Sequence, residues 1–182
     1  MKFHTRFQRN TSDTRNLTPE NRNPFFQKTS DRDSLWNMGK KISNDVLYEL
    51  IDHTADFGIR VFGADAADLF RNGALALTDL MTDVRLVKST HACHVTVSGD
   101  DWQDLMVNWL RELLYLWAGE QKLIRDVDIE SIREGEIRAI VRFEAYSPKR
   151  HVLKNEIKAV TYHQIQVFDS GKGWQAQIIF DA

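Results

Sequence analysis

Four carboxylates near the two ends of the folded region have the types and positions that could bind a metal ion. Asp52 and Asp56 lie in a polar interruption between apolar runs, and Asp181 is followed by Ala182, whose α-carboxylate adds another negative charge. Two carboxylates about 4 Å apart repel by about 1 kcal/mol in water and by about 4 kcal/mol at an effective dielectric constant of about 20. A hard cation would relieve this repulsion, and oxygen ligands favour Ca²⁺, Mg²⁺ or Mn²⁺ over Zn²⁺.

The first of these acidic groups also has a purely structural interpretation. Asp52 and Asp56 could accept hydrogen bonds from nearby backbone N–H groups and do no more than cap a turn. His53, beside Asp52, could be a metal ligand, a proton shuttle or a semi-buried ring with satisfied hydrogen bonds. Spacing alone does not choose among these roles.

A second cluster of candidate binding residues is basic and lies in the loop of residues 147–155 and just after it. Its members are Lys149, Arg150, His151, Lys154 and Lys158. Arg binds phosphate bidentately and Lys acts as a point charge, so the cluster could contact a phosphate, a nucleotide or an acidic partner surface. A solvated loop with no ligand accounts for the same residues.

Charge and composition narrow the classes of partner. The 182 residues have a net charge of −2, but residues 1–45 hold nine Lys/Arg against five Asp/Glu, which leaves 15 against 21 in the remainder. An acidic body argues against nonspecific binding of duplex nucleic acid, which requires a basic footprint. The single Cys93 excludes an intramolecular disulfide and fits a reducing compartment. With no apolar run of about 18 residues, the sequence predicts no membrane span.

The periodicity of the sequence divides the chain into an extension and a domain. Residues 1–44 show neither helical nor strand periodicity and are rich in polar residues, which predicts a disordered N-terminal extension. Residues 45–182 are expected to form one domain. Helices are predicted from the cap Asp65 to Met81, and from Asp100 or Asp101 to about Gly119.

Strands account for the rest of the predicted domain. They are expected over residues 57–63, 91–97, 127–132, 137–146 and 158–168, and after a turn at residues 170–173. That turn reads Ser-Gly-Lys-Gly and precedes a strand, so we interpret it as a hairpin and not as a P-loop. The order of elements predicts an α+β fold with two helices packed on one face of a mainly antiparallel β-sheet.

Three motifs taken together resemble the archease family. They are Asp52-His-Thr-Ala-Asp56, Glu156-Ile-Lys-Ala-Val-Thr-Tyr-His163 and the terminal Ile178-Ile-Phe-Asp181, with the helix from Asp65 and the following Met81-Thr-Asp83 after the first motif. The resemblance covers about residues 48–182, almost all of the predicted domain. It implies an archease-like fold for residues 45–182.

The resemblance also implies a function. Members of this family are accessory proteins of the RtcB-type RNA-splicing ligase, which joins RNA ends in tRNA splicing and repair. They promote guanylylation of the ligase and its multiple turnover, and they are not themselves known as ligases. A non-enzymatic cytoplasmic protein is therefore expected, with the ligase as partner, indirect contact with RNA or GTP, and no membrane association.

By the same resemblance, Asp56, Asp181 and Ala182 bind a divalent metal ion, with calcium as the first expectation and magnesium or manganese as alternatives. Asp52, His53 and His163 lie in the shared motifs and are candidates for the shell around these ligands. The alternative function is a metal-dependent hydrolase or phosphodiesterase acting on RNA ends or nucleotides. It would use the same aspartates, with His53 or His163 as acid–base partner.

Overall fold

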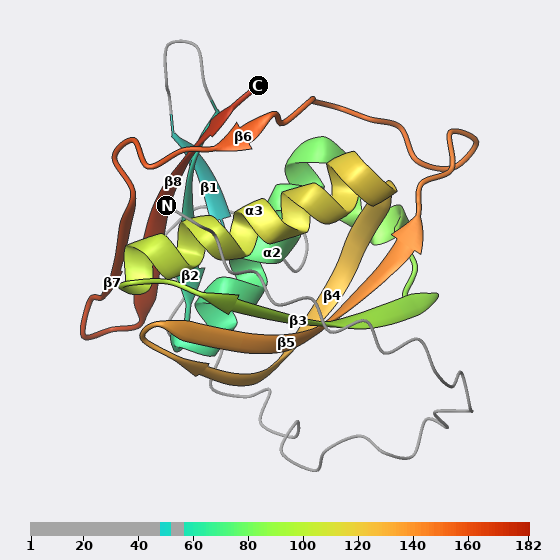
Figure 1. The fold of residues 1–182 in the computed structure, drawn as a ribbon. Helices are drawn as coiled ribbons and strands as arrows, with labels where there is room; N and C mark the ends of the chain where they lie inside the picture. The colour runs from blue at the N-terminus through green and yellow to red at the C-terminus, as the bar shows by residue number, and fades with distance from the viewer. Residues whose placement is uncertain (1–47, 52–56) are drawn as a thin grey trace. The chain divides into compact units, whose positions relative to one another are not determined.

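A computed structural model describes residues 48–51 and 57–182. These residues form an α+β unit with antiparallel strand pairing throughout, as the sequence predicts (Figure 1). The extension expected over residues 1–44 lies outside the described residues, and so do the three residues Asp52, His53 and Asp56 of the first motif.

The strands of the described residues form two antiparallel sheets. The five-stranded sheet has the order β1-β2-β8-β6, with β7 also paired to β8; the three-stranded sheet has the order β3-β5-β4. The strands of the first sheet are β1 (Tyr48–Ile51), β2 (Phe57–Gly63), β6 (Ala159–Val160), β7 (Gln166–Asp169) and β8 (Trp174–Asp181). Those of the second are β3 (His91–Ser98), β4 (Lys122–Arg133) and β5 (Glu136–Ala145).

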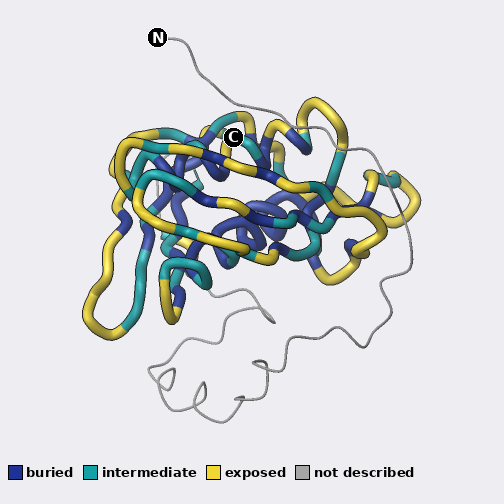
Figure 2. Tube along the Cα trace, turned by 60° about the horizontal axis from the view of Figure 1, so that its bottom comes forward, coloured by how far each residue is buried: buried dark blue, intermediate teal, exposed yellow. Residues whose placement is uncertain are grey.

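The two helices, α2 (Ala66–Met81) and α3 (Trp102–Glu120), each contact strands of both sheets. The expectation of a single sheet is therefore too simple. Of the 16 residues of α2, 12 are buried, so this helix needs cover on more than one side. Small residues such as Ala74 and Ala76 extend its buried surface beyond the large apolar positions on which the sequence prediction relied. Figure 2 shows the buried segments in the interior, with exposed residues on the connecting loops and along outer strands such as β3.

The two helices begin in the same way, at the end of a strand. A Cβ on Gly63 would lie 2.2 Å from the backbone nitrogen of Leu69, and one on Gly99 would lie 2.4 Å from that of Leu105, so only glycine fits either corner. Two residues after each glycine, the N-cap accepts a backbone N–H at 2.8 Å; the caps are Asp65 and Asp101. Asp65 confirms the predicted start of the first helix, and Asp101 is the correct member of the pair proposed for the second.

Three predicted elements differ in extent. The strand expected over residues 127–132 is the longer β4, which begins at Lys122. Residues 158–168 form two short strands, β6 and β7, because the chain turns between them, where Gln164 has a left-handed backbone (φ 52°). Helix α3 passes through Gly119 and ends at Gln121, which adopts the left-handed C-cap conformation instead. The hairpin predicted at residues 170–173 is confirmed, since Ser170 N–H donates to the Gly173 carbonyl at 2.9 Å.

Candidate functional site

Strand β8 carries the predicted metal ligand Asp181 at its end. Its position is fixed by pairing on both sides, with β2 along one edge and with β6 and β7 along the other. Phe180 is fully buried, so the next side chain, Asp181, projects to the opposite face and is exposed. Ala182 is half-buried and packs against the hydrophobic core.

The Asp181 carboxylate is available for a ligand. The backbone carbonyl of Asp181 accepts a hydrogen bond from Lys158 N–H at 2.8 Å, which anchors the end of the strand. Among the residues that the structure describes, no hydrogen bond or ion pair engages its side chain. An exposed carboxylate with both oxygens uncommitted fits a hard divalent cation. Asp56, another of the predicted ligands, lies outside the described residues.

The register of the five-stranded sheet shows where the chain continues from the first motif, residues 52–56, into β2. Phe57, the first residue of β2, is the Cα partner of Phe180, the residue before Asp181. On the other side of β8, Ala159 is the partner of Asp181. The structure thus brings the start of β2, the end of β8 and β6 to one end of the five-stranded sheet.

Two further predicted residues belong to the segment around β6. Lys158 is exposed and adjoins Asp181 through the backbone hydrogen bond given above. His163 is exposed on the turn after β6, where its N–H donates to Thr161 Oγ1 at 3.3 Å. Thr161 is itself tied to the Ile179 carbonyl by its N–H and its hydroxyl, both at 3.0 Å. Both predicted residues therefore lie on a segment fastened to the last strand.

The basic loop is built differently from the sequence prediction. His151 is 1% exposed, which corrects its assignment as a surface contact. Its Nδ1 accepts a hydrogen bond from Ser147 N–H at 3.0 Å, and its Nε2 lies 3.3 Å from Glu144 Oε2. Arg150 forms an ion pair with the same Glu144 carboxylate. Because the ring is buried and both of its nitrogens contact groups of the fold, His151 stabilises the loop and does not reach a partner. Lys149 is exposed.

Glu144, which the sequence reasoning missed, is the centre of this loop. It is 8% exposed and also accepts a hydrogen bond from Lys88 N–H at 2.9 Å. Burial alone would raise the pKa of its carboxyl, but the Lys88 N–H, the Arg150 guanidinium and His151 outweigh burial and lower that pKa below its ordinary value. The carboxylate is therefore ionised and joins three segments of the chain.

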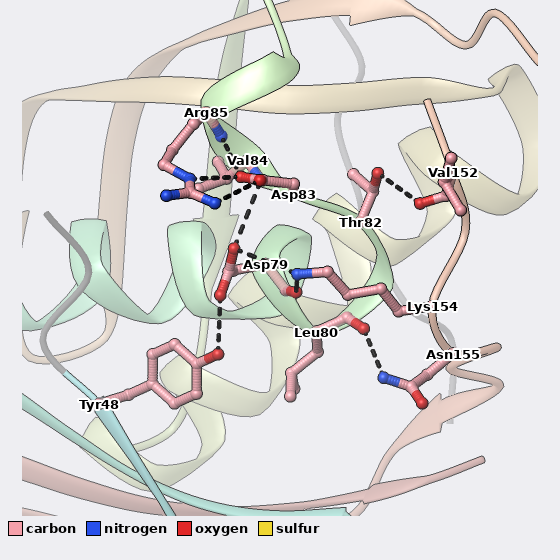
Figure 3. A network of polar contacts seen from close by, with 10 residues as sticks. All are labelled: Tyr48, Asp79, Leu80, Thr82, Asp83, Val84, Arg85, Val152, Lys154 and Asn155. Atoms are coloured by element: carbon pink, nitrogen blue, oxygen red, sulfur yellow. Dashed lines mark hydrogen bonds and ion pairs between the residues drawn. The ribbon is translucent and has the colours of Figure 1, made fainter. Parts of the chain in front are cut away.

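A second acidic residue that the sequence reasoning missed, Asp79, organises the C-terminal end of α2 (Figure 3). Its carboxylate accepts a hydrogen bond from the Tyr48 hydroxyl at 2.9 Å and lies 3.7 Å from Lys154 Nζ. Burial, followed by the Asp79 hydrogen bond and charge, raises the pKa of the Tyr48 hydroxyl well above its usual range. Position 79 lies on the face of α2 opposite the large apolar residues such as Leu69, Phe70 and Leu77, where a polar residue is ordinary, so the sequence pattern carries no signal for this role.

The remaining contacts at this end of α2 fix the loop of residues 147–155. Lys154 N–H donates to the Met81 carbonyl at 2.8 Å, Asn155 Nδ2 to the Leu80 carbonyl at 2.7 Å, and Thr82 Oγ1 to the Val152 carbonyl at 2.9 Å. Beside them, the hydrogen bond from Arg85 lowers the pKa of Asp83 to about 2. The polar groups of this network bond to one another, and no buried side-chain N or O atom of the described residues lacks a partner.

The described residues supply no activated nucleophile at Cys93. This half-buried residue lies on β3, and burial raises the pKa of its thiol, which opposes formation of the thiolate. Neither α2 nor α3 is long and apolar enough to cross a membrane, and the same holds for every helix in the described part of the chain.

The architecture and the end of β8 define a class of protein: an α+β domain with an uncommitted carboxylate at the end of a central strand of its larger sheet. The Archease protein family matches residues 48–182, and the chain belongs to this family. It is 36% identical over 138 residues to the protein archease of Methanosarcina mazei, covering 74% of this chain and 94% of that relative. It is also 36% identical over 138 residues to the protein archease of Pyrococcus abyssi, covering 74% and 97%.

A solved structure agrees with these relatives. The solution structure of protein 1598 of Methanobacterium thermoautotrophicum superposes with a TM-score of 0.63 at 30% sequence identity. The match covers 74% of this chain and 98% of that one. The predicted family and fold class are therefore both confirmed.

Proposed function

We propose that this protein is a non-enzymatic activator of an RtcB-type RNA ligase, which promotes guanylylation of the ligase and its multiple turnover in tRNA splicing and RNA repair. The observation that carries the proposal is membership of the archease family across the whole of residues 48–182. The cytoplasm is the compartment that this role requires. The protein would contact the ligase directly, and RNA or GTP only through it.

The proposed activator site contains a divalent cation held by Asp56, Asp181 and Ala182, calcium first and magnesium or manganese as alternatives. The uncommitted Asp181 carboxylate supports this assignment, as does the pairing of Phe57 with Phe180, because Asp56 and Asp181 are their neighbours in the sequence. A bound cation would supply positive charge close to the ligase's nucleotide. Asp52, His53 and His163 are proposed to surround the ligands.

Charge neutralisation and positioning limit reactions in which phosphate groups are transferred. An accessory protein can therefore accelerate nucleotide transfer without a nucleophile of its own. In this scheme the metal site that contains Asp181 faces the ligase. The exposed Lys149 and Lys158 and the partly exposed Arg150 contact phosphate or acidic groups of the partner.

The test measures guanylylation of the ligase, and RNA joining at substoichiometric ligase, with and without this protein. Asp181→Asn is expected to remove most of the stimulation. Glu134→Gln is the matched control, because it removes one negative charge from an exposed position in the turn between β4 and β5. Full stimulation by a protein carrying both Asp56→Ala and Asp181→Ala would refute the proposal for the site.

The same preparation discriminates the alternative function. The protein alone is incubated with RNA cyclic phosphates or with GTP, with and without a metal chelator. Hydrolysis that depends on Asp181 and stops on chelation would establish a metal-dependent hydrolase in place of an activator. We expect no turnover without the ligase.

A further inference from the structure

Three apolar side chains are exposed beside the C-terminal end of α2. Leu86 is 51% exposed, Val152 is 74% exposed and Leu153 is 43% exposed. Leu86 ends the short 3₁₀ helix η2 (Val84–Leu86), whereas Val152 and Leu153 belong to the loop of residues 147–155. We call these three side chains the Val152 surface.

Hydrogen bonds hold the two contributing segments side by side. The Thr82 hydroxyl donates to the Val152 carbonyl at 2.9 Å, as Figure 3 shows, and Lys154 N–H donates to the Met81 carbonyl at 2.8 Å. Glu144 connects the same segments again, since it accepts Lys88 N–H and pairs with Arg150. The backbone beneath the exposed side chains is thus fixed before any partner arrives.

A fixed backbone changes what the exposure means. Three polar groups of this loop bond to other parts of the fold or within the loop: the His151 ring, the Lys154 N–H and the Asn155 side-chain amide. The apolar side chains of Val152 and Leu153 are left in water. Ordering a mobile loop upon association costs free energy, and this loop already has its order. Apolar side chains that are exposed together on a preorganised backbone mark a surface that another protein can cover.

The charges around the Val152 surface indicate the chemistry of its partner. Arg85, Arg150 and Lys154 pair with Asp83, Glu144 and Asp79, so these cations are compensated. Lys88 and Lys149 are exposed, and neither side chain has an ion pair within the part of the chain that the structure describes. The local excess of charge is positive, although residues 46–182 as a whole are acidic. A complementary surface would present an apolar pocket bordered by carboxylates.

We propose that the Val152 surface is where the RNA ligase docks, through such a pocket. The proposal rests on the proposed function for the identity of the partner. A second copy of this chain fits less well, because a twofold contact would place the unpaired lysines of both copies together. The surface is aliphatic and has no ring on which bases could stack, so single-stranded RNA also fits less well.

The experiment measures the Kd between the full chain and the ligase from the same genome. Val152→Asp is expected to weaken binding about tenfold or more, and Lys149→Glu to weaken it a few-fold, by an amount that shrinks as salt is added. Phe168→Asp is the matched control, because Phe168 is a comparably exposed apolar side chain (44%) on β7, outside the Val152 surface. All three variants should unfold at the temperature of the wild type, since each changes an exposed side chain.

The outcomes separate this proposal from the function on which it rests. If the wild type binds and stimulates the ligase, but Val152→Asp binds equally well, the docking surface is wrong and the proposed function stands. If the wild type neither binds nor stimulates the ligase, both the proposed function and the proposed docking surface are refuted. If Val152→Asp instead abolishes self-association of the wild type in sedimentation, without weakening ligase binding, the surface joins copies of this chain and the proposal is overturned.

Discussion

Acidic side chains occupy two contrasting environments in this domain. At the C-terminal end of α2 and at the end of β5, Asp79 and Glu144 are nearly buried and each binds several donors. At the end of β8, Asp181 is exposed, and no interaction engages its side chain within the described residues. The first environment uses carboxylates to hold segments together. The second leaves a carboxylate free for another molecule.

The contrast separates acids whose carboxylates have partners within the fold from an acid whose carboxylate is available for a ligand. Removing a buried carboxylate leaves its donors unsatisfied, so the cost appears in the free energy of unfolding. Removing an exposed carboxylate without partners changes that free energy little, and its cost appears only in what the protein binds. Each of the following substitutions tests on which side of this division a residue lies.

The largest effect is expected for Glu144→Ala. The substitution leaves Lys88 N–H, the Arg150 guanidinium and the buried His151 ring without the carboxylate that they contact. It should lower the free energy of unfolding by about 3 kcal/mol. Chemical denaturation at pH 7 measures this loss. Glu144→Gln, which keeps an oxygen for Lys88 N–H, should cost less, and Glu134→Ala in the exposed turn should cost almost nothing. Equal stability of Glu144→Ala and Glu134→Ala would contradict the assignment.

The pH dependence of the same carboxyl sharpens this test. The pKa of Glu144 is lowered in the folded state, so its contribution is present above the ordinary glutamate pKa of about 4.3 and is lost as the pH falls through the lower folded value. Wild-type stability should therefore decline more steeply with acid than that of Glu144→Gln. Parallel stability curves from pH 7 to pH 3 would show that this carboxylate has no preferred charge state in the fold.

The next effect is expected at the two helix N-caps. Asp65 and Asp101 accept the backbone N–H groups of Asp68 and Asp104 in identical geometry, at 2.8 Å. Asp65→Ala and Asp101→Ala should each cost about 1 kcal/mol, and their costs should agree within about 0.5 kcal/mol because the two corners are built alike. Denaturant midpoints measure both. A large difference between them would show that neighbouring contacts, and not the cap, set the cost.

A comparable loss of stability is expected for Tyr48→Phe, but this loss should depend on pH in the alkaline range. Burial and Asp79 raise the pKa of the Tyr48 hydroxyl, so its stabilisation is complete below the unfolded pKa of about 10 and is lost as the pH rises toward the folded value. The variant should lose about 1 kcal/mol at pH 7 and show a shallower decline above pH 10. Tyr115→Phe is the control, because Tyr115 is 58% exposed. If both variants follow the wild type at high pH, the Tyr48–Asp79 bond is not a stabilising contact.

The sequence predicted much of the frame, for identifiable physical reasons. Both helix starts follow a strand, a glycine and an aspartate two residues later, and such local signals need no tertiary information. The division into two sheets was missed because the apolar pattern of α2 shows one face, whereas its small residues let a second sheet approach. The break at Gln164 was missed because no glycine or proline marks it.

The site divides in the same way. The motif around Asp181 could be found in the sequence because its position at the end of a strand is local. The burial of His151 could not be found there, since it depends on Glu144 and on a turn of its own loop. Basic residues close together in a sequence indicate a basic surface only when the fold leaves them unpaired, and only some members of this loop meet that condition.

The smallest effect on stability is expected for Asp181→Asn. The backbone hydrogen bond from Lys158 and the pairing with Ala159 do not involve the side chain, so both survive the change. The free energy of unfolding without added metal should stay within about 0.5 kcal/mol of the wild type. Calorimetric titration with Ca²⁺ or Mn²⁺ should nevertheless show much weaker binding, because a carboxylate ligand has been replaced by a neutral amide.

Asp181→Asn also tests the distinction between the two kinds of carboxylate. If the distinction holds, this substitution changes metal binding without changing the free energy of unfolding. The wild type should gain thermal stability on addition of the metal and the variant should gain little, because a ligand stabilises only the state that binds it. Glu144→Gln should do the opposite, losing stability while keeping its gain from the metal. If Asp181→Asn instead unfolds early without metal, or binds Ca²⁺ and Mn²⁺ as tightly as the wild type, then Asp181 belongs with the acids whose carboxylates have partners within the fold and the end of β8 is not the metal site.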